Sequence, residues 1–486
     1  MENSHHKFAK DVLIVGIADA LTAVSGIIVM VLITKTLGAA GYGIWAQVNV
    51  TISLAMSFAG LGLPLAMTRF LAAEKNGKEI QEGFYSIFSF VFLTTLTLSL
   101  FLIVFSDVIA KAFFDGATRI VVITGLIILV WSLDWVCLNL FATFRQMRKY
   151  AVFIIADICG QIGLIAYLVL SGYGLLSIVL SVLAVRLIIF FVLFFLIKSQ
   201  IGIRRPHLSR IKEYLSFGLP TVPRSMAGWA VASSDRYVIG YFLGAASVGV
   251  YSAGYAIGVI PFMLAVVLGF VLTPTLCKLY DEGRVNEVKT HLSYSLKYLL
   301  AIAIPFVFGA AVLAKPVLGM VSTSKIAAEG YFIVPLVALG TLFMAVHVPI
   351  ANILILVKKP KVQGAIWALC ALVNLGLNVL VVPLWGILGA AITTLISYAL
   401  ALGMTVYYSL KELRFSIEWS FVLKSLVASM LMSLVIWKMG PEATLSTILT
   451  VVTGVIVYAT ALVLLKGFRR EEWQFARELF RTHKGA

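Results

Sequence analysis

The chain has 486 residues, of which 61% are hydrophobic and only 12% are charged. Soluble globular proteins average about half apolar and a quarter charged residues, so this composition excludes a soluble domain and predicts a protein embedded in a bilayer. The formal net charge of +16 follows from the loop charges described below. It gives no support to nucleic-acid binding, and contact with anionic membrane lipids is the simpler expectation.

The chain contains fourteen apolar segments, each long enough to cross a membrane as a helix. They predict an all-α polytopic membrane protein with about 14 transmembrane helices. In chain order the segments are 11–36, 43–68, 83–106, 119–143, 150–171, 174–198, 214–242, 249–275, 293–314, 330–356, 364–383, 386–409, 418–437 and 446–466.

The positive charges predict the orientation. With the N-terminus placed in the cytoplasm, inside segments carry 28 of the 38 Lys and Arg residues and outside segments carry 6. Cytoplasmic loops are the ones enriched in Lys and Arg. Both termini are therefore expected in the cytoplasm.

A nine-residue segment occurs twice. Leu37 to Trp45 reads LGAAGYGIW, and the segment 206 residues later, Leu243 to Tyr251, reads LGAASVGVY, with five identical positions. Each copy ends one apolar segment and begins the next. The chain is therefore predicted to hold two six-helix repeats, and an even number of spans in each makes the repeats parallel.

The expected organisation is two lobes around a central cleft. The N-terminal lobe covers 1–212, the C-terminal lobe 213–412, two additional helices 413–466, and a cytoplasmic amphipathic tail 467–486. Paired lobes of this kind are the usual architecture of a secondary transporter.

Motifs of catalysis and cofactor binding are absent from the sequence. It contains no GxxxxGK[ST] loop, HExxH, GxSxG or paired CxxC. The longest outside loop, about 106–118, leaves no room for an external domain that would hold an acceptor sugar. The four cysteines are scattered through the spans and predict neither a disulfide nor a metal site. We therefore expect a protein that is not an enzyme and has no resident cofactor.

Charged side chains within the spans indicate the substrate path, because a charge in hydrocarbon is costly and persists where it faces water or a partner. Arg186 lies near the middle of the sixth span, and we expect it to face the cleft and bind substrate. The alternative is a structural pair with an Asp of a neighbouring span. Asp19, Asp134 and Asp157 are candidates for coupling transport to Na⁺ or H⁺, or else they balance buried arginines.

The seventh span is the richest in polar residues. Arg224 and Asp235 are eleven residues apart, about three helical turns, and therefore share a face. Arg236, the next residue, lies about 100° further round the helix than Asp235. We expect all three to contact substrate, with two alternatives: Asp235 and Arg236 only neutralise each other, and Arg224 extends to the inner headgroups. Asn374 and Asn378, one turn apart in the eleventh span, are candidates for binding a sugar or for contacts between helices.

Several motifs resemble the polysaccharide-biosynthesis flippases of the multidrug/oligosaccharidyl-lipid/polysaccharide exporter superfamily. They are the two LGxxxxGx[YW] junctions, SDRYVIGYFLG at 234–244 and YLSFGLP at 214–220. The number of spans agrees with this family over the whole chain. Lipid II flippases are similar in outline but typically keep several Arg in the first two spans, whereas the first span here has Asp19 and no Arg.

The resemblance implies a transporter that flips a polyprenyl-(di)phosphate-linked oligosaccharide from the inner to the outer leaflet by alternating access. The polyprenyl tail would stay in lipid, along a groove beside the last two spans. Expected partners are membrane lipids, the lipid-linked glycan and glycan polymerase or ligase machinery, in the cytoplasmic membrane of a prokaryote. The alternative is an H⁺- or Na⁺-coupled antiporter that exports soluble drugs or metabolites. On the first hypothesis, Arg186→Ala should abolish transport and leave expression intact.

Overall fold

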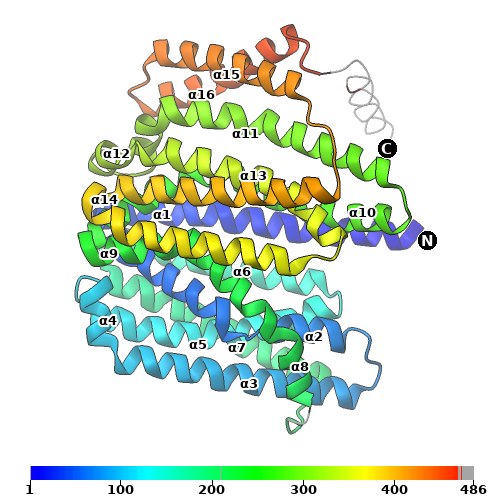
Figure 1. Ribbon diagram of the computed structural model, residues 1–486. Coiled ribbons are helices and arrows are strands. Elements are labelled where there is room, and N and C mark those ends of the chain that lie inside the picture. The colour runs from blue at the N-terminus through cyan, green and yellow to red at the C-terminus, as the bar shows by residue number, and fades with distance from the viewer. Residues whose placement is uncertain (1, 208–209, 469–471, 473–486) are drawn as a thin grey trace. The chain divides into compact units, whose positions relative to one another are not determined.

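A computed structural model describes residues 2–207, 210–468 and 472 of the chain (Figure 1). The described part is almost entirely helical and contains no strand. Its helices are α1 Glu2–Ala59, α2 Leu63–Leu71, α3 Gly77–Val104, α4 Ser106–Phe113, α5 Thr118–Thr143, α6 Met147–Leu170, α7 Leu175–Ile201, α8 Ile211–Gly218, α9 Val222–Gly258, α10 Ile260–Asp281, α11 Val285–Val321, α12 Ser324–Gly330, α13 Ile333–Leu356, α14 Pro360–Glu412, α15 Trp419–Met439 and α16 Thr444–Leu464.

The predicted membrane-spanning architecture is confirmed. Twelve helices of the described chain are long and apolar enough to cross a membrane. Two of them, α1 and α14, are pairs of spans joined end to end at a non-helical residue, Gly38 and Gly386 respectively. Dividing both gives the fourteen spans expected from the sequence, and the protein is a multi-pass membrane protein.

Three predicted spans are assembled from more than one helix. Segment 214–242 combines the end of α8, a 3₁₀ turn at Leu219–Thr221 and the first part of α9. Segment 43–68 breaks where Leu61 and Gly62 adopt positive φ angles, and α2 begins there with Pro64 in its first turn. Segment 249–275 consists of the end of α9 and most of α10, and Pro261 lies in the first turn of α10. Proline is tolerated at a helix start because the amide it lacks would have no partner there. These prolines therefore mark helix starts.

The chain forms two compact units, each described separately. Unit 1 comprises residues 1–252 and 367–393, and unit 2 comprises residues 253–366 and 394–486. Helices α9 and α14 each contribute to both units. The units are groups of contacting residues and do not delimit sequence repeats, so the lobe boundaries at 212 and 412 stay a prediction.

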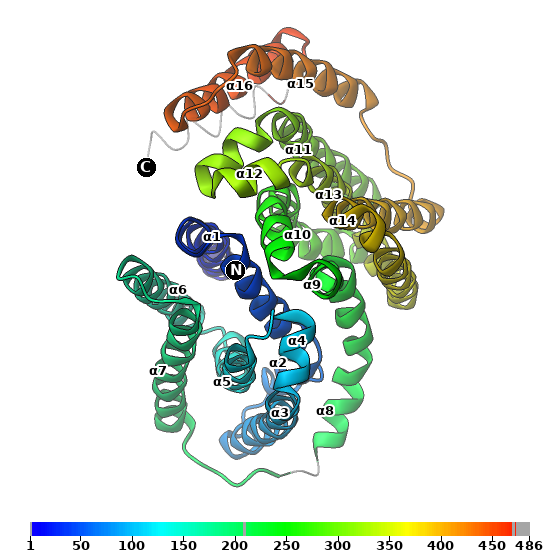
Figure 2. The same ribbon diagram turned by 90° about the vertical axis from the view of Figure 1, so that its left-hand side faces the viewer.

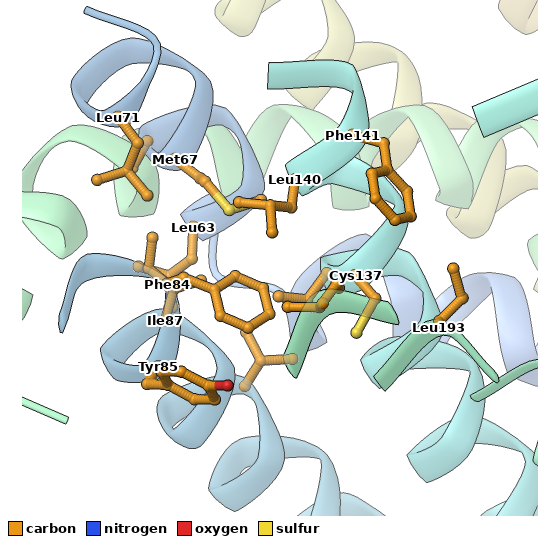
Figure 3. Packing of buried hydrophobic residues seen from close by; sticks show 14 of the residues in the cluster. Leu63, Met67, Leu71, Phe84, Tyr85, Ile87, Cys137, Leu140, Phe141 and Leu193 are labelled. Atoms are coloured by element: carbon orange, nitrogen blue, oxygen red, sulfur yellow. The ribbon is translucent and has the colours of Figure 1, made fainter. Parts of the chain in front are cut away.

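In unit 1, α5 lies between α3 and α7 (Figure 2). The core there is formed by apolar side chains from α2, α3, α5 and α7 (Figure 3), among them Met67, Phe84, Leu140 and Leu193. In unit 2, α10 and α11 pack on α13, and α15 and α16 pack against α11. The mostly aliphatic surfaces of these helices suit a lipid environment, in which packing rather than water exclusion holds helices together.

The two copies of the repeated segment pack against each other within unit 1. In each copy the second residue, Gly38 or Gly244, leaves the helical conformation with φ of 69° or 78°. A Cβ built on Gly43 would lie 1.7 Å from the carbonyl oxygen of Ala245, and a Cβ on Gly249 would lie 2.0 Å from that of Ala39.

These two contacts are related by the 206-residue offset of the repeat, since Gly43 corresponds to Gly249 and Ala39 to Ala245. The junctions therefore meet with approximate two-fold symmetry, backbone against backbone, and glycine is required on both sides. We call this contact the glycine junction. Asp115, in the loop after α4, accepts hydrogen bonds from the Ala245 amide at 3.1 and 3.2 Å and so caps the helical segment that follows Gly244.

Replacing either glycine of the junction should destabilise the protein. In Gly43→Ala and Gly249→Ala, the new methyl group meets a carbonyl oxygen that no side-chain rotation can move, and overpacking of this kind typically costs about 1–3 kcal/mol. Both variants should lower the thermal unfolding temperature of the purified protein. Gly228→Ala is the control on the same helix, because nothing lies within 4 Å of its added Cβ. Equal unfolding temperatures for all three variants would show that the junction is not close-packed.

Candidate functional site

Arg186 pairs with two of the predicted acids inside unit 1. Its guanidinium lies 2.7 Å from the Asp157 carboxylate of α6 and 3.8 Å from the Asp134 carboxylate of α5. It also stacks over the Trp131 ring at 3.7 Å from the ring centroid. We call these four residues the Arg186 cluster. The structure thus brings together three residues that the sequence named separately, and the arrangement is the structural pair that the sequence left as an alternative.

The Arg186 cluster carries two carboxylates and one guanidinium, hence one negative charge in excess when all are ionised. Asp134 is completely buried, and within the described chain neither of its oxygens accepts a hydrogen bond. Asp157 is also held by the side-chain amide of Gln161 at 2.7 Å. The two acids therefore differ. Asp157 has both a close ion pair with Arg186 and a hydrogen bond from Gln161, whereas Asp134 has only the longer contact with Arg186.

Asp235 and Arg236 form the second polar cluster, in α9. The Arg236 guanidinium lies 2.9 Å from the Asp235 carboxylate, and it also donates to the Ala232 carbonyl at 2.7 Å. The Tyr251 hydroxyl donates to the other Asp235 oxygen at 2.5 Å. Asp235 is fully buried. The pair therefore neutralises itself, which was the alternative to a substrate contact, and Tyr251 of the repeated segment completes it.

Asn374 and Asn378 extend this cluster into α14. The Ser234 hydroxyl donates to the side-chain oxygen of Asn374 at 3.3 Å, and the Asn378 amide donates to that same oxygen at 3.0 Å. Thr393, beyond the Gly386 break, donates to Asn378 at 2.7 Å. Both asparagines are fully buried. They connect helices, and they bridge the two arms of α14 across its break.

The two remaining candidates lie apart from these clusters. Arg224 is in the first turn of α9, exposed, and in the described chain it forms no ion pair. The helix face predicted to carry both Arg224 and Asp235 is therefore exposed at Arg224, near the start of α9, and buried at Asp235. Asp19 lies in α1, and its side chain is outside the described residues.

Unit 2 contains an apolar groove of about 520 Å³. One wall is a stripe along α11 with a four-residue spacing, and α15 and α16 form the facing wall. Small residues line its middle, including Gly309, Ala310 and Gly454. The sequence supplied this groove only through family resemblance, since the apolar periodicity of a lipid-facing helix looks the same as that of a groove wall.

The sequence missed the partners that complete each cluster. Trp131 and Tyr251 are aromatic residues among many in apolar spans, and no periodicity separates a ring that stacks on Arg from one that faces lipid. Ser234 could have been named from the sequence, because it precedes Asp235 in the motif SDRYVIGYFLG. Its bond to Asn374 depends on helix packing, which the sequence does not display.

The structure changes the expectation for Arg186 variants. Arg186→Gln leaves two buried carboxylates without their cation, and breaking a buried ion pair on one side typically costs about 3–5 kcal/mol. The variant should unfold at a markedly lower temperature, and adding Asp157→Asn should restore part of the loss because one uncompensated charge is removed. Arg224→Gln, an exposed cation without an ion pair, is the control and should unfold as wild type does. An Arg186→Gln protein as stable as wild type would contradict the buried pair.

Comparison with solved structures shows a shared fold. A lipid II flippase MurJ in an inward closed conformation superposes with a TM-score of 0.76, with 20% identity over 93% of this chain and 98% of that one. An inward-facing multidrug resistance MATE family transporter of the MOP superfamily gives a TM-score of 0.67, with 14% identity over 80% of this chain and 93% of that one. With sequence identities this low, the superpositions show that the fold is shared, and nothing about function follows from them.

Two curated relatives come from Haloferax volcanii. The probable low-salt glycan biosynthesis flippase Agl15 is 21% identical over 276 residues, which are 56% of this chain and 58% of the relative. The probable flippase AglR is 26% identical over 168 residues, which are 34% of this chain and 35% of the relative. The matched regions thus span about half the length of the first and a third of the second.

Family models match in two places. A MatE model matches residues 220–380. The model of polysaccharide biosynthesis proteins matches residues 8–280, more than half of the chain. The protein therefore belongs to the polysaccharide biosynthesis protein family.

Proposed function

We propose that the protein is a secondary transporter that flips a polyprenyl-(di)phosphate-linked oligosaccharide from the inner to the outer leaflet by alternating access. The observation that carries the proposal is the apolar groove along α11, α15 and α16. A soluble solute has no use for such a surface, whereas an isoprenoid chain matches it in chemistry. The flippase names of the two Haloferax relatives support the same class of substrate.

The groove suits a lipid tail because of its small residues. In a bilayer, an apolar chain gains little by leaving lipid, so a groove holds it through close van der Waals contact rather than through the hydrophobic effect. Gly309, Ala310 and Gly454 let a chain approach the helix backbones. The tail would travel along this wall while the polar glycan crosses elsewhere.

Ion coupling is proposed through the Arg186 cluster. Its excess negative charge would be neutralised by one H⁺ or Na⁺ on Asp134, the acid with no hydrogen bond, while Asp157 stays paired with Arg186. Intramembrane carboxylates are the usual carriers of such coupling. Asp19 remains a second candidate from the sequence.

The proposed setting is the cytoplasmic membrane of a prokaryote, with both termini in the cytoplasm. The distribution of Lys and Arg between alternate loops supports this orientation. Glycan polymerase or ligase machinery would then act on the flipped product at the outer surface, and we propose it as a partner on that ground.

A second candidate function is the ion-coupled antiport of soluble drugs or metabolites. The MatE match at 220–380 favours it. Arg186 does not argue against a cation substrate, because its charge is balanced by Asp134 and Asp157. The apolar groove, rather than Arg186, is therefore the feature that favours a lipid-linked substrate over a soluble one.

Reconstitution tests the proposed function. Liposomes containing the protein and a polyprenyl-diphosphate oligosaccharide should expose the sugar to an impermeant lectin faster than protein-free liposomes, with the glycan chemically unchanged. No acceleration with several glycans under imposed H⁺ and Na⁺ gradients, together with efflux of an organic cation, would instead support the antiporter.

Filling the groove should slow the flipping of a lipid-linked substrate. Gly309→Trp places an indole where the nearest side-chain atom is that of Met432 at 3.8 Å from the built Cβ. If the tail must displace it at a cost of about 1–3 kcal/mol, the rate should fall roughly tenfold or more. The lectin assay measures this rate. Gly403→Trp, at an open position of α14 in the same unit, is the control. Equal rates for the two variants would contradict a role for the groove.

A further inference from the structure

A second cavity of unit 2, of about 430 Å³, lies where the apolar groove ends. It is formed by the end of α11, by α12, which packs there against α11 (Figure 1), by the connection between α15 and α16, and by the start of α16. We call it the α11–α16 pocket. Small-ligand sites have volumes on the order of 300–1,000 Å³, so this pocket has room for a headgroup.

The α11–α16 pocket continues the groove along the same two helices. On α11, Val317 lines the groove, and Gly319 and Met320 line the pocket. On α16, Thr447 lines the pocket, and Thr450, about one turn further along, lines the groove. An apolar surface and a polar pocket therefore follow each other, which is the order that a lipid with a polar headgroup requires.

Four polar side chains of the pocket have no partner within the described chain. Lys315 of α11 and Glu442 of the α15–α16 connection carry opposite charges, and neither forms an ion pair or a hydrogen bond through its side chain there. The hydroxyls of Ser324 and Thr444 likewise make no hydrogen bond in the described chain. A cation, an anion and two hydroxyls are thus available to a ligand in one pocket.

These groups fit a sugar phosphate. The Lys315 ammonium suits a phosphate, which lysine binds as a compact positive charge. The Glu442 carboxylate only accepts hydrogen bonds, and sugar hydroxyls donate them. A phosphate without the sugar matches the pocket less well, because it would meet the negative charge of Glu442 with no donor between them.

The neighbouring groove favours a sugar phosphate that is attached to an apolar chain. In the orientation proposed above, the connections that carry Lys315, Lys325 and Lys438 face the outside. The α11–α16 pocket then lies at the outer end of the groove. A lipid whose chain occupies the groove and whose headgroup occupies the pocket would belong to the outer leaflet.

We propose that the α11–α16 pocket binds the headgroup of a polyprenyl-phosphate-linked sugar in the outer leaflet, with Lys315 on the phosphate, Glu442 on the first sugar and the chain in the apolar groove. The identity of the lipid rests on the proposed function. The site holds the flipped product, whereas the proposed function concerns the crossing itself.

The test measures binding of two radiolabelled probes to the full-length protein in phosphatidylcholine nanodiscs. One probe is a polyprenyl-phosphate glucose, and the other is the same polyprenyl phosphate without glucose. Lys315→Gln should weaken the binding of both probes about tenfold, the order of one charge-assisted hydrogen bond. Glu442→Gln should weaken the glucose-bearing probe about fivefold. It should leave the sugar-free probe unchanged or bound more tightly, because a repelling carboxylate is removed.

Two residues of α12 provide matched controls. Lys325 and Glu329 are exposed and do not line the pocket. Lys325→Gln and Glu329→Gln should bind both probes as wild type does. Wild-type affinity of either probe for the folded Lys315→Gln protein overturns the proposal. So does an equal effect of Glu442→Gln on the two probes, or a loss in the controls as large as that in the pocket variants.

Competitors separate the lipid-linked sugar from other ligands with a phosphate. If soluble glucose 1-phosphate displaces the glucose-bearing probe at the probe's own concentration, the site takes a free sugar phosphate and the assignment to a lipid is overturned. Phosphatidylethanolamine, whose headgroup also joins a phosphate to a hydrogen-bond donor, is the second competitor. Displacement by an equal amount of this phospholipid would show a general phospholipid site and overturn the assignment to a sugar.

Translocation is measured separately with the lectin assay, so that the two proposals can fail independently. Absence of translocation, with binding that still depends on Lys315 and Glu442, would reject the proposed function and leave this site standing. Normal translocation, with binding that depends on neither residue, would reject the site and leave the proposed function.

Discussion

The contact on which the rest of the structure depends is the glycine junction between the two repeated segments. Gly43 and Gly249 have no room for a side chain because each faces a backbone carbonyl of the other copy. Such an approach of two backbones is what small residues permit in membranes. It joins the start of the second span of one repeat to the start of the second span of the other through two equivalent contacts. In the proposed alternating access, the rocking motion of the two halves would open this contact, and the junction would then control the motion.

The buried charges around this framework are neutralised locally. Arg186 is held by Asp134 and Asp157, Asp235 by Arg236 and Tyr251, and Lys297 by Glu418 and Glu472. The Arg186 cluster holds one acid more than its cation requires. In hydrocarbon an excess charge is costly. This cluster is therefore a place where the binding of a small cation would be favoured.

The spans and the internal repeat could be predicted from sequence because both follow from hydropathy and from residues such as Gly38 and Gly244, whose roles are local. The polar clusters could not. The partner of Arg186 is set by the packing of α5, α6 and α7, and three acids were equally eligible in the sequence. Lys297 lies near the start of the predicted span 293–314, whereas α11 begins at Val285 and buries the Lys297 side chain. Which charges pair is a property of tertiary packing, and no single helix displays it.

The most direct measurement bridges the glycine junction. In a chain whose four cysteines are replaced, Ala40→Cys and Ala246→Cys place one thiol in each repeated segment at equivalent, exposed positions. A short reducible cross-linker would join them, and translocation of a lipid-linked glycan would be followed in proteoliposomes. The account predicts that the bridged protein stops transporting and recovers when the bridge is reduced. Undiminished transport by the bridged protein would contradict it.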